Sequence, residues 1–327
     1  MASAALGLTV VGGLSVGHAE TPDGRSGVTV VRFDRAARTV VDVRGGASAT
    51  YDTASLSVDA TFGRRWAVFF AGGSVFGLDA ARGVRAELIA GGAGHRAFGN
   101  PNRIAPVAGA ALFDLPPDER PLPDYEALGA DAARRAGRGR VRSGTVGAGS
   151  GATVGKYLGR PRSMPGGIGT AGARLPGRVA VGVLLVVNAV GAIRDPRTGR
   201  WVAGARTARG GIAPPDRRWA RGPRSRGTTL GLVATDAPLD RPGLARVAAI
   251  VHAGIGRAIV PYQTSTDGDV VFAVSTEGDR VGPPEPWPGA LADRIGVVAA
   301  DLAADAVVDA VRPSTGARRK LPSRAER

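Results

Sequence analysis

The stretch Arg226–Thr235, RGTTLGLVAT, joins a basic loop to an apolar strand. From Thr228 to Thr235 the residues are mostly apolar or β-branched, which predicts a buried strand. The preceding segment, Arg206 to Gly227, is rich in arginine, glycine and proline and has no packing pattern, so we predict a mobile loop there. Thr228 thus places a hydroxyl group where a long loop enters the core. Threonine also starts many ordinary strands, so this position alone does not define a site.

Other polar residues stand at the ends of predicted strands. Asn188 follows the most apolar segment, Arg178–Val187, which predicts a central strand. Asp267 and Asp269 flank a glycine just before the predicted strand Val270–Ser275. The glycine-rich run Gly144–Lys156 indicates that tightly turned backbone positions Lys156 as well. Each feature alone has an ordinary structural explanation, but together they can converge on one point. The side chains concerned are those of Lys156, Asn188, Thr228, Asp267 and Asp269.

The remaining pattern predicts a layered α+β fold. Two β-branched runs separated by a charged turn, Val28–Phe33 and Thr39–Val43, predict a hairpin. The segment Ala67–Ala90 has helical length and many small residues, which favours a helix in an interior layer. Further predicted helices are Ala127–Ala136, Leu244–Ile259 and Leu291–Leu302, with a linker at Pro116–Pro123 and a frayed tail at Arg312–Arg327. Strands and helices do not alternate steadily, which favours α+β over a doubly wound sheet.

Composition excludes several kinds of site. The chain has 327 residues, a net charge of +15, no cysteine and three histidines. Disulfides, thiolate catalysis and cysteine-bound metals are therefore excluded, and we expect neither a metal nor a cofactor. The basic excess raises the possibility of nucleic-acid binding, but no recognised binding motif is visible, so we do not expect that partner. No segment has the pattern of an export signal or a membrane span, so we expect a cytoplasmic protein.

Two familiar catalytic patterns are present only in part. Gly13–Gly17, GLSVG, matches the nucleophile elbow, but a turn follows where that motif needs a helix, so we predict a plain strand. The run Gly144–Lys156 resembles a phosphate loop, but that motif requires glycine at position 150 and serine or threonine at position 157, where this chain has Ser150 and Tyr157. Neither segment predicts a site of its own.

Taken together, the sequence resembles the L-aminopeptidase/D-esterase family of self-processing amidohydrolases, and within it the branch that hydrolyses 6-aminohexanoate (nylon) oligomers. The resemblance extends from Gly13 to Val311 and rests on many motifs in the same order. They are Leu14–His18, Val41–Gly46, Phe70–Gly73, Phe76–Leu78, Asn188–Gly191, Thr228–Thr229, Ala234–Asp236, Asp267–Asp269 and Val271–Val274.

The resemblance implies a single four-layer αββα domain, 1–327, like that of N-terminal-nucleophile hydrolases. It implies self-cleavage between Gly227 and Thr228 into an α chain, 1–227, and a β chain, 228–327. Thr228 would be the nucleophile, with Lys156, Asn188, Asp267 and Asp269 as its catalytic neighbours. Small peptides or oligoamides would be the substrates, and the cut units would form a homo-oligomer, which we expect to be a homotetramer.

Two positions depart from the nylon-oligomer branch. That branch has asparagine before the nucleophile, where this chain has Gly227, and a Tyr-Asp pair where this chain has Phe113-Asp114. Phe113 is therefore our candidate substrate-binding residue, and its missing hydroxyl bears on the substrate class. Gly227 leaves its carbonyl unobstructed and allows strained backbone angles.

The implied chemistry uses one residue twice. Once cleavage frees the amine of Thr228, that amine, with an ordinary pKa of about 7.7–8.0, can take the proton of its own hydroxyl. Asn188 would donate to the oxyanion, a Lys156 cation would lower the pKa of the amine, and the two aspartates would hold both amines in place. Two alternatives are an acyltransferase of the ornithine-acetyltransferase type and a non-enzymatic nucleic-acid-binding protein that uses the basic loop.

Overall fold

The computed structural model describes residues 7–97, 99–115, 121–177, 179–215, 225–277, 287 and 289–312. Its longer elements are β1 (Leu14–Glu20), β2 (Gly27–Val43), β4 (Arg64–Ala71), α1 (Ala80–Ala90), β5 (Val107–Ala111), α2 (Tyr125–Arg134), β8 (Gly167–Arg174), β9 (Ala180–Asn188), β14 (Thr228–Thr235), α3 (Arg241–Ala258), β16 (Val270–Ser275) and α4 (Ala290–Val311). Short strands are β3 (Ala49–Tyr51), β6 (Thr153–Val154), β7 (Met164–Pro165), β10 (Ala192–Arg194), β11 (Trp201–Ala203), β12 (Ala205–Arg206), β13 (Ile212–Ala213) and β15 (Ile259–Val260).

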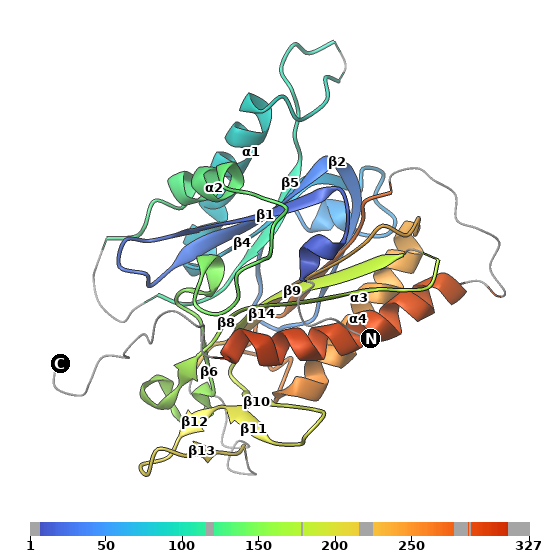
Figure 1. The fold of residues 1–327 in the computed structure, drawn as a ribbon. Helices are drawn as coiled ribbons and strands as arrows, with labels where there is room; N and C mark the ends of the chain where they lie inside the picture. The colour runs from blue at the N-terminus through green and yellow to red at the C-terminus, as the bar shows by residue number, and fades with distance from the viewer. Residues whose placement is uncertain are drawn as a thin grey trace.

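Within these residues, nine strands form one hydrogen-bonded sheet. Its order is β3-β5-β4-β2-β16-β14-β9-β8, and β1 pairs with β2. Strand β14 runs parallel to β16 and antiparallel to β9. The short strands form three small sheets, β10 with β11 and β15, β12 with β13, and β6 with β7. In Figure 1 these small sheets lie at one end of the molecule, close to the start of β14.

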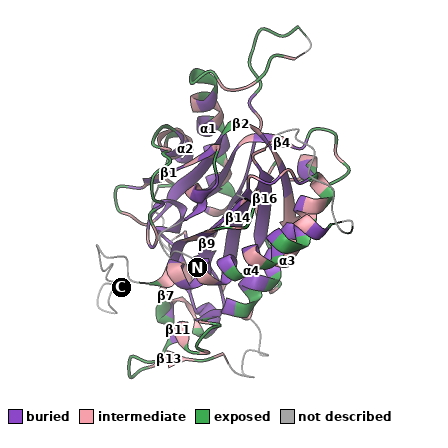
Figure 2. Cartoon of the chain, turned by 45° about the vertical axis from the view of Figure 1, so that its right-hand side comes forward, coloured by how far each residue is buried: buried purple, intermediate pink, exposed green. Residues whose placement is uncertain are grey.

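Three apolar cores divide the fold into four layers. The first lies between helices α1 and α2 and one face of β2 and β4, and includes Val28, Val30 and Phe69. The second lies between the two halves of the sheet, where Phe70 from β4 meets Phe272 from β16. The third packs the outer face of β9, β14 and β16 against α3 and α4. Figure 2 shows buried strands between these helices, whose outward faces carry exposed residues. The order of layers is αββα, as expected.

The predicted hairpin is wrong, because Gly27 to Val43 form the single strand β2. Its first half pairs with β1 and β4, and its second half pairs with β16. The charged residues Asp34 and Arg35 are exposed where the register with β4 shifts between Arg32 and Ala37. The charged segment therefore marks the place where the strand passes from one half of the sheet to the other.

The helix expected at Ala67–Ala90 is wrong in its first part. Residues Arg64–Ala71 form β4, a 3₁₀ segment follows at Ser74–Asp79, and only Ala80–Ala90 is an α-helix. Residues Ala67 to Ala71 are completely buried between β2 and β5, and a strand buried on both faces lacks the alternation that distinguishes it from a helix.

Other elements agree with the sequence patterns. The strands at Thr228–Thr235 and Val270–Ser275 and the helices α2 and α3 are confirmed within a few residues, and GLSVG lies mostly in β1. The last predicted helix is confirmed as α4, but it continues past Leu302 to Val311. Strand β9 is buried throughout but is next to the edge strand β8, so it is not central. Residues 116–120, 216–224 and 313–327 lie outside the described residues, and with them much of the predicted linker, the basic loop and the tail.

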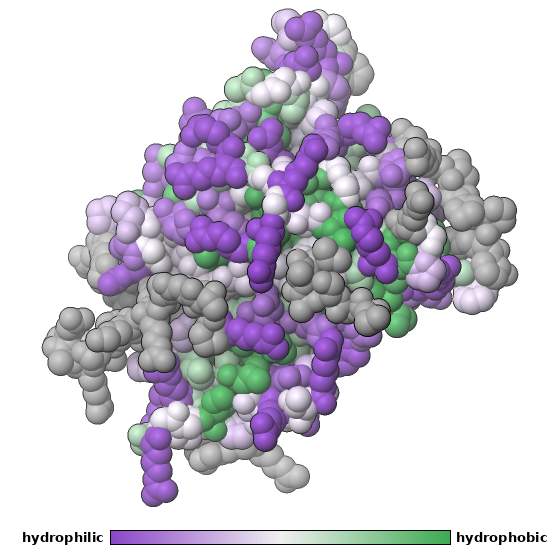
Figure 3. All heavy atoms as spheres, in the orientation of Figure 1, coloured by the Kyte–Doolittle hydropathy of each residue, from purple (hydrophilic) through white to green (hydrophobic). Residues whose placement is uncertain are grey.

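The surface view in Figure 3 shows hydrophilic residues spread over this face of the molecule, with smaller hydrophobic areas between them. None of the described helices combines the length and the apolar composition needed to cross a bilayer.

Candidate active site

The candidate nucleophile lies between two neighbouring strand ends. Thr228 begins β14, Asn188 ends β9, and the antiparallel register pairs the two residues directly. On the other side, Gly227 forms a parallel bridge with Asp267, just before β16. All three polar residues are buried. Three adjacent strand ends therefore bring Thr228, Asn188 and Asp267 together.

The hydroxyl of Thr228 lies against the peptide bond that precedes it. Its Oγ1 donates a hydrogen bond to the carbonyl oxygen of Gly227 at 2.5 Å. The backbone N–H of Gly268 donates to the same oxygen at 3.0 Å. The N–H of Gly268 is therefore positioned to stabilise the negative charge that this oxygen gains when the hydroxyl attacks the carbonyl carbon.

The side chain of Lys156 reaches Asn188, the strand partner of Thr228, from a tight turn at Gly155. Gly155 has a left-handed φ of 75°, and a Cβ there would lie 2.1 Å from the backbone of Gly204, so only glycine fits. Nζ of Lys156 donates to the backbone oxygen and to Oδ1 of Asn188, at 2.7 and 2.6 Å. Burial lowers the pKa of Lys156 to about 7, although the charge of Asp267 partly opposes the change. Lys156 therefore changes its protonation close to neutral pH.

The side chain of Asn188 is held on three sides. Its Oδ1 accepts hydrogen bonds from Lys156 and from the backbone N–H of Thr153, the latter at 3.0 Å. Its Nδ2 donates to the backbone oxygen of Phe113 at 3.1 Å. An amide nitrogen carries two N–H groups, and this bond uses one of them. The amide is thus fixed in orientation and keeps one N–H with which it can donate to an oxyanion.

The two carboxylates of the turn face different partners. Asp269 accepts the backbone N–H groups of Thr229, at 2.6 Å, and of Gln263, at 3.0 Å. Oδ1 of Asp267 accepts the N–H of Val190 at 3.3 Å. Burial, and then the charge of Asp267, raises the pKa of Asp269 to about 8. Through its hydrogen bond to the N–H of Thr229, Asp269 holds the backbone directly after the nucleophile in place.

We expected the two aspartates to hold Lys156 in place, but no direct hydrogen bond joins them to its amine among the described residues. Among the described residues, the hydrogen bonds of Nζ go to Asn188, and the aspartates act on the amine through their charge. A backbone loop positions the turn that carries them. The N–H groups of Arg44 and Ala47 donate to the carbonyl oxygens of Asp269 and Asp267, both at 2.9 Å.

Phe113 lies beside Asn188, whose Nδ2 donates to its backbone oxygen. The guanidinium carbon of Arg226 lies 5.9 Å from the centre of its ring, in a cation–π contact. The next residue, Asp114, accepts the N–H of Gly73 at 2.7 Å, and burial raises its pKa to about 6. Arg160 donates to the backbone oxygen of Asp114 at 3.0 Å. Arg226, which precedes Gly227 at the candidate cleavage site, thus contacts the ring of the candidate substrate-binding residue.

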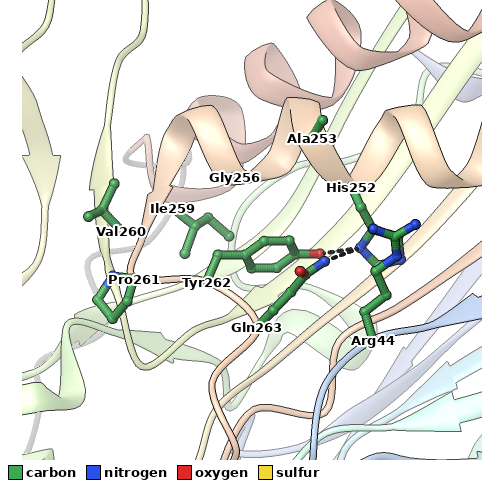
Figure 4. A pocket seen from close by; sticks show the side chains of 9 residues that line it. All are labelled: Arg44, His252, Ala253, Gly256, Ile259, Val260, Pro261, Tyr262 and Gln263. Atoms are coloured by element: carbon green, nitrogen blue, oxygen red, sulfur yellow. Dashed lines mark hydrogen bonds between the residues drawn. The ribbon is translucent and has the colours of Figure 1, made fainter.

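A surface hollow of about 410 Å³ lies behind the acidic turn, and Figure 4 shows the residues that line it. Nδ1 of His252 is 2.8 Å from the hydroxyl of Tyr262 and 3.2 Å from Nε2 of Gln263. Its Nε2 is 3.1 Å from the backbone oxygen of Asp42. Gln263 has a left-handed φ of 61° and donates its N–H to Asp269. The sequence analysis did not identify His252, because its contacts with Asp42 and Gln263 join segments that are far apart in the chain.

One sequence signal could have singled out the lysine. The chain has 43 basic residues, and only Lys156 and Lys320 are lysines. A guanidinium keeps its charge at any ordinary pH, whereas a buried lysine amine can lose it. A lysine in a chain that otherwise uses arginine is therefore a candidate for a group that must exchange a proton.

The chain is similar over most of its length to known peptidases and oligomer hydrolases. The model of peptidase family S58 matches residues 7–320. The chain is 36% identical to an uncharacterized aminopeptidase of Mycobacterium tuberculosis, over 93% of each protein. It is 30% identical to a 6-aminohexanoate-oligomer endohydrolase of a Kocuria species, over 92% of this chain and 84% of that protein.

Two solved structures share the fold. They are a β-aminopeptidase of a Burkholderia species and an L-aminopeptidase/D-Ala-esterase/amidase of Ochrobactrum anthropi, described as a new variant of the N-terminal-nucleophile hydrolase fold. Both superpose with a TM-score of 0.66 at 21% identity, over 95% of this chain and 87% and 86% of theirs. The α+β class and the layering expected from the sequence are therefore confirmed.

Proposed function

Because the chain belongs to peptidase family S58, we propose that it is a self-processing amide hydrolase in which Thr228 is the nucleophile. Family membership makes the protein a hydrolase, so the non-enzymatic interpretation is set aside. The relatives described above are named as aminopeptidases or hydrolases, which favours water over an amine as the acyl acceptor.

One observation carries the proposal. Oγ1 of Thr228 and the N–H of Gly268 both donate to the carbonyl oxygen of Gly227. The hydroxyl is thus beside the bond that it would attack, and a backbone donor is ready for the oxyanion that attack would create. The peptide bond between residues 227 and 228 is the first substrate, and the cut separates an α chain, 1–227, from a β chain, 228–327.

In the cleavage reaction, Oγ1 of Thr228 attacks the carbonyl carbon of Gly227. The hydroxyl proton goes to a base, the C–N bond breaks, and the nitrogen of Thr228 leaves as a protonated amine. Water then hydrolyses the ester, which releases the carboxylate of Gly227 and restores the hydroxyl. The free amine of Thr228 does not exist before this step, so self-cleavage needs another base.

Lys156 is our candidate for that first base. Its amine is buried, its pKa of about 7 leaves much of it neutral at neutral pH, and it is bonded to the strand partner of Thr228. A base is most effective when its pKa lies near the working pH. After cleavage, the new amine of Thr228 takes over this role, and Asn188 donates its remaining amide N–H to the oxyanion of the substrate.

The substrates that we propose are small peptides or oligoamides, with Phe113 as a contact on the acyl side. Its ring becomes available once the segment that ends at Gly227 moves away after cleavage. A cytoplasmic location and a homotetramer of cut units remain parts of the proposal. Light scattering on the purified protein tests the assembly.

Intact-mass analysis and denaturing electrophoresis test the main proposal. Wild-type protein should separate into fragments that end at Gly227 and begin at Thr228, and the Thr228→Ala variant should stay full length. The matched variant Thr229→Ala, which removes the neighbouring hydroxyl but keeps the N–H that Asp269 accepts, should still be cut. A wild-type protein that remains whole and nevertheless hydrolyses amides would refute the scheme.

A further inference from the structure

His252 joins three segments of the chain behind the acidic turn, Asp267–Asp269. It belongs to α3 and its residue is 2% exposed. Its ring contacts the backbone of Asp42 near the end of β2, and the side chains of Tyr262 and Gln263 in the loop that leads to the turn. In Figure 4 these two side chains point toward the ring. A buried imidazole therefore links α3 to β2 and to the loop that carries the turn.

The neighbours of the ring fix the position of its proton. The backbone oxygen of Asp42, 3.1 Å from Nε2, can only accept a hydrogen bond, so Nε2 carries a proton. Burial lowers the pKa of His252, so the imidazole is neutral at neutral pH and its Nδ1 is an acceptor. The hydroxyl of Tyr262 and the side-chain amide of Gln263 donate to Nδ1, at 2.8 and 3.2 Å. The ring is thus a donor to β2 and an acceptor for the loop.

Gln263 has a backbone conformation that residues with a side chain seldom adopt. Its φ of 61° lies in the left-handed region, where the Cβ crowds the backbone. Such a conformation persists only where the surrounding structure enforces it. At Gln263 the side-chain amide donates to His252, and the backbone N–H donates to Asp269 at 3.0 Å. His252 therefore helps to fix the direction in which the N–H of Gln263 points.

The carboxyl group of Asp269 connects Gln263 to the nucleophile. Its Oδ2 accepts the N–H of Gln263, and its Oδ1 accepts the N–H of Thr229 at 2.6 Å. The group is planar and rigid, so a shift at one oxygen changes the bond at the other. Thr229 follows Thr228 directly, and a change in its backbone moves Oγ1 of Thr228 relative to the carbonyl of Gly227. A small misplacement of reacting atoms lowers a rate strongly.

We propose that His252 is a positioning residue for the reaction of Thr228, an inference that rests on the proposed function. As a neutral imidazole with its proton on Nε2, it accepts the side-chain amide of Gln263. Gln263 in turn holds Asp269, and Asp269 holds the backbone that follows the nucleophile. In the alternative, the ring has only a structural role and ties α3 to β2.

Two amide variants separate these roles. The amide of asparagine is as many bonds from the backbone as Nδ1 of histidine, and the amide of glutamine is as many bonds away as Nε2. His252→Asn therefore keeps an acceptor for Gln263 and loses the bond to Asp42. His252→Gln keeps the bond to Asp42 and loses the acceptor. Positioning through Gln263 requires the first variant to be the more active, and a tie between α3 and β2 requires the second.

The rate of self-cleavage is the first measurement, followed by denaturing electrophoresis after synthesis in a cell-free system. The reaction is intramolecular, so substrate binding does not enter. We expect His252→Gln to be cut at least about tenfold more slowly than wild type, since a buried donor is left without its acceptor. His252→Asn and the control His95→Gln, at an exposed histidine, should stay within threefold of wild type. His252→Gln within threefold of wild type, or His252→Asn no faster than His252→Gln, would overturn the proposal.

Nuclear magnetic resonance of wild-type protein with ¹⁵N-labelled histidine is the second measurement, and it decides if the variants do not fold. The chain has three histidines, and the ring of His252 is identified by its proximity to the ring of Tyr262, whose centre is 6.0 Å away. At pH 7 we expect a neutral ring with its proton on Nε2. A proton on Nδ1, alone or together with one on Nε2, would overturn the proposal, because Nδ1 could not then accept the amide of Gln263.

The results separate this inference from the function on which it rests. A wild-type chain that is not cut between Gly227 and Thr228 would refute the proposed function. A wild-type chain that is cut there, together with a His252→Gln variant that is cut equally fast, would refute only the role of His252.

Discussion

Lys156 should titrate near pH 7 in the folded protein, and replacing it with methionine should remove a distinct pH dependence of stability. The ordinary pKa of a lysine is 10.5, and burial lowers that of Lys156 to about 7. At about 1.4 kcal/mol for each pH unit, the fold disfavours the ammonium by on the order of 5 kcal/mol. The two hydrogen bonds to Asn188 remain possible for a neutral amine, which still has two N–H groups.

The sign of the effect follows from the protons bound in each state. Between pH 7 and 10.5 the unfolded chain keeps the proton on Lys156, while the folded chain has lost it. The free energy of unfolding therefore increases with pH in this window, by up to about 1.4 kcal/mol per unit, and this contribution is constant below pH 7. The Lys156→Met variant lacks this contribution. The free energy of unfolding of the protein with Lys156 should therefore increase relative to that of the variant as the pH rises from 7 to 10.

Two measurements check this prediction. In protein with ¹³C-labelled lysine, only Lys156 and Lys320 give signals, and the variant identifies which signal belongs to Lys156. Urea unfolding at pH 6 to 10 should be compared between Thr228→Ala and Thr228→Ala with Lys156→Met, so that neither protein is cut. A Lys156 signal that titrates near pH 10, or a stability difference that does not change with pH, would refute the argument.

Two further predictions concern the neighbours of Thr228. Asn188→Ala should lower kcat by two to three decades with little change in KM, because it removes a candidate oxyanion donor and the acceptor of one Lys156 bond, and an unchanged kcat would remove Asn188 from that role. Asp269→Asn has nearly the same shape, but its amide can accept only one of the N–H groups of Thr229 and Gln263. Unfolding measurements should therefore show a loss of about 1–3 kcal/mol, and a loss below 0.5 kcal/mol would argue against this role.

The sequence predicted more of the site than of the strand order. The polar ends of three apolar segments indicated Asn188, Thr228 and Asp267 because the end of a buried strand is visible in a local pattern. The errors occurred where the local pattern was ambiguous. The charged residues within β2 suggest a turn, and the completely buried β4 looks like part of a helix. In both cases the deciding contacts come from strands far away in the chain.

By itself, the sequence determined the family, the junction of Gly227 with Thr228, and the kinds of side chain available for the chemistry. These properties depend on residue types and on their order. Only the tertiary structure decided that Lys156 is bonded to Asn188, that burial lowers its pKa to about 7, and that Asp267 and Val190 close the space beside Gly227. The physical reason is that solvent exclusion and steric contact depend on distances between separate segments, and no local pattern of residues contains those distances.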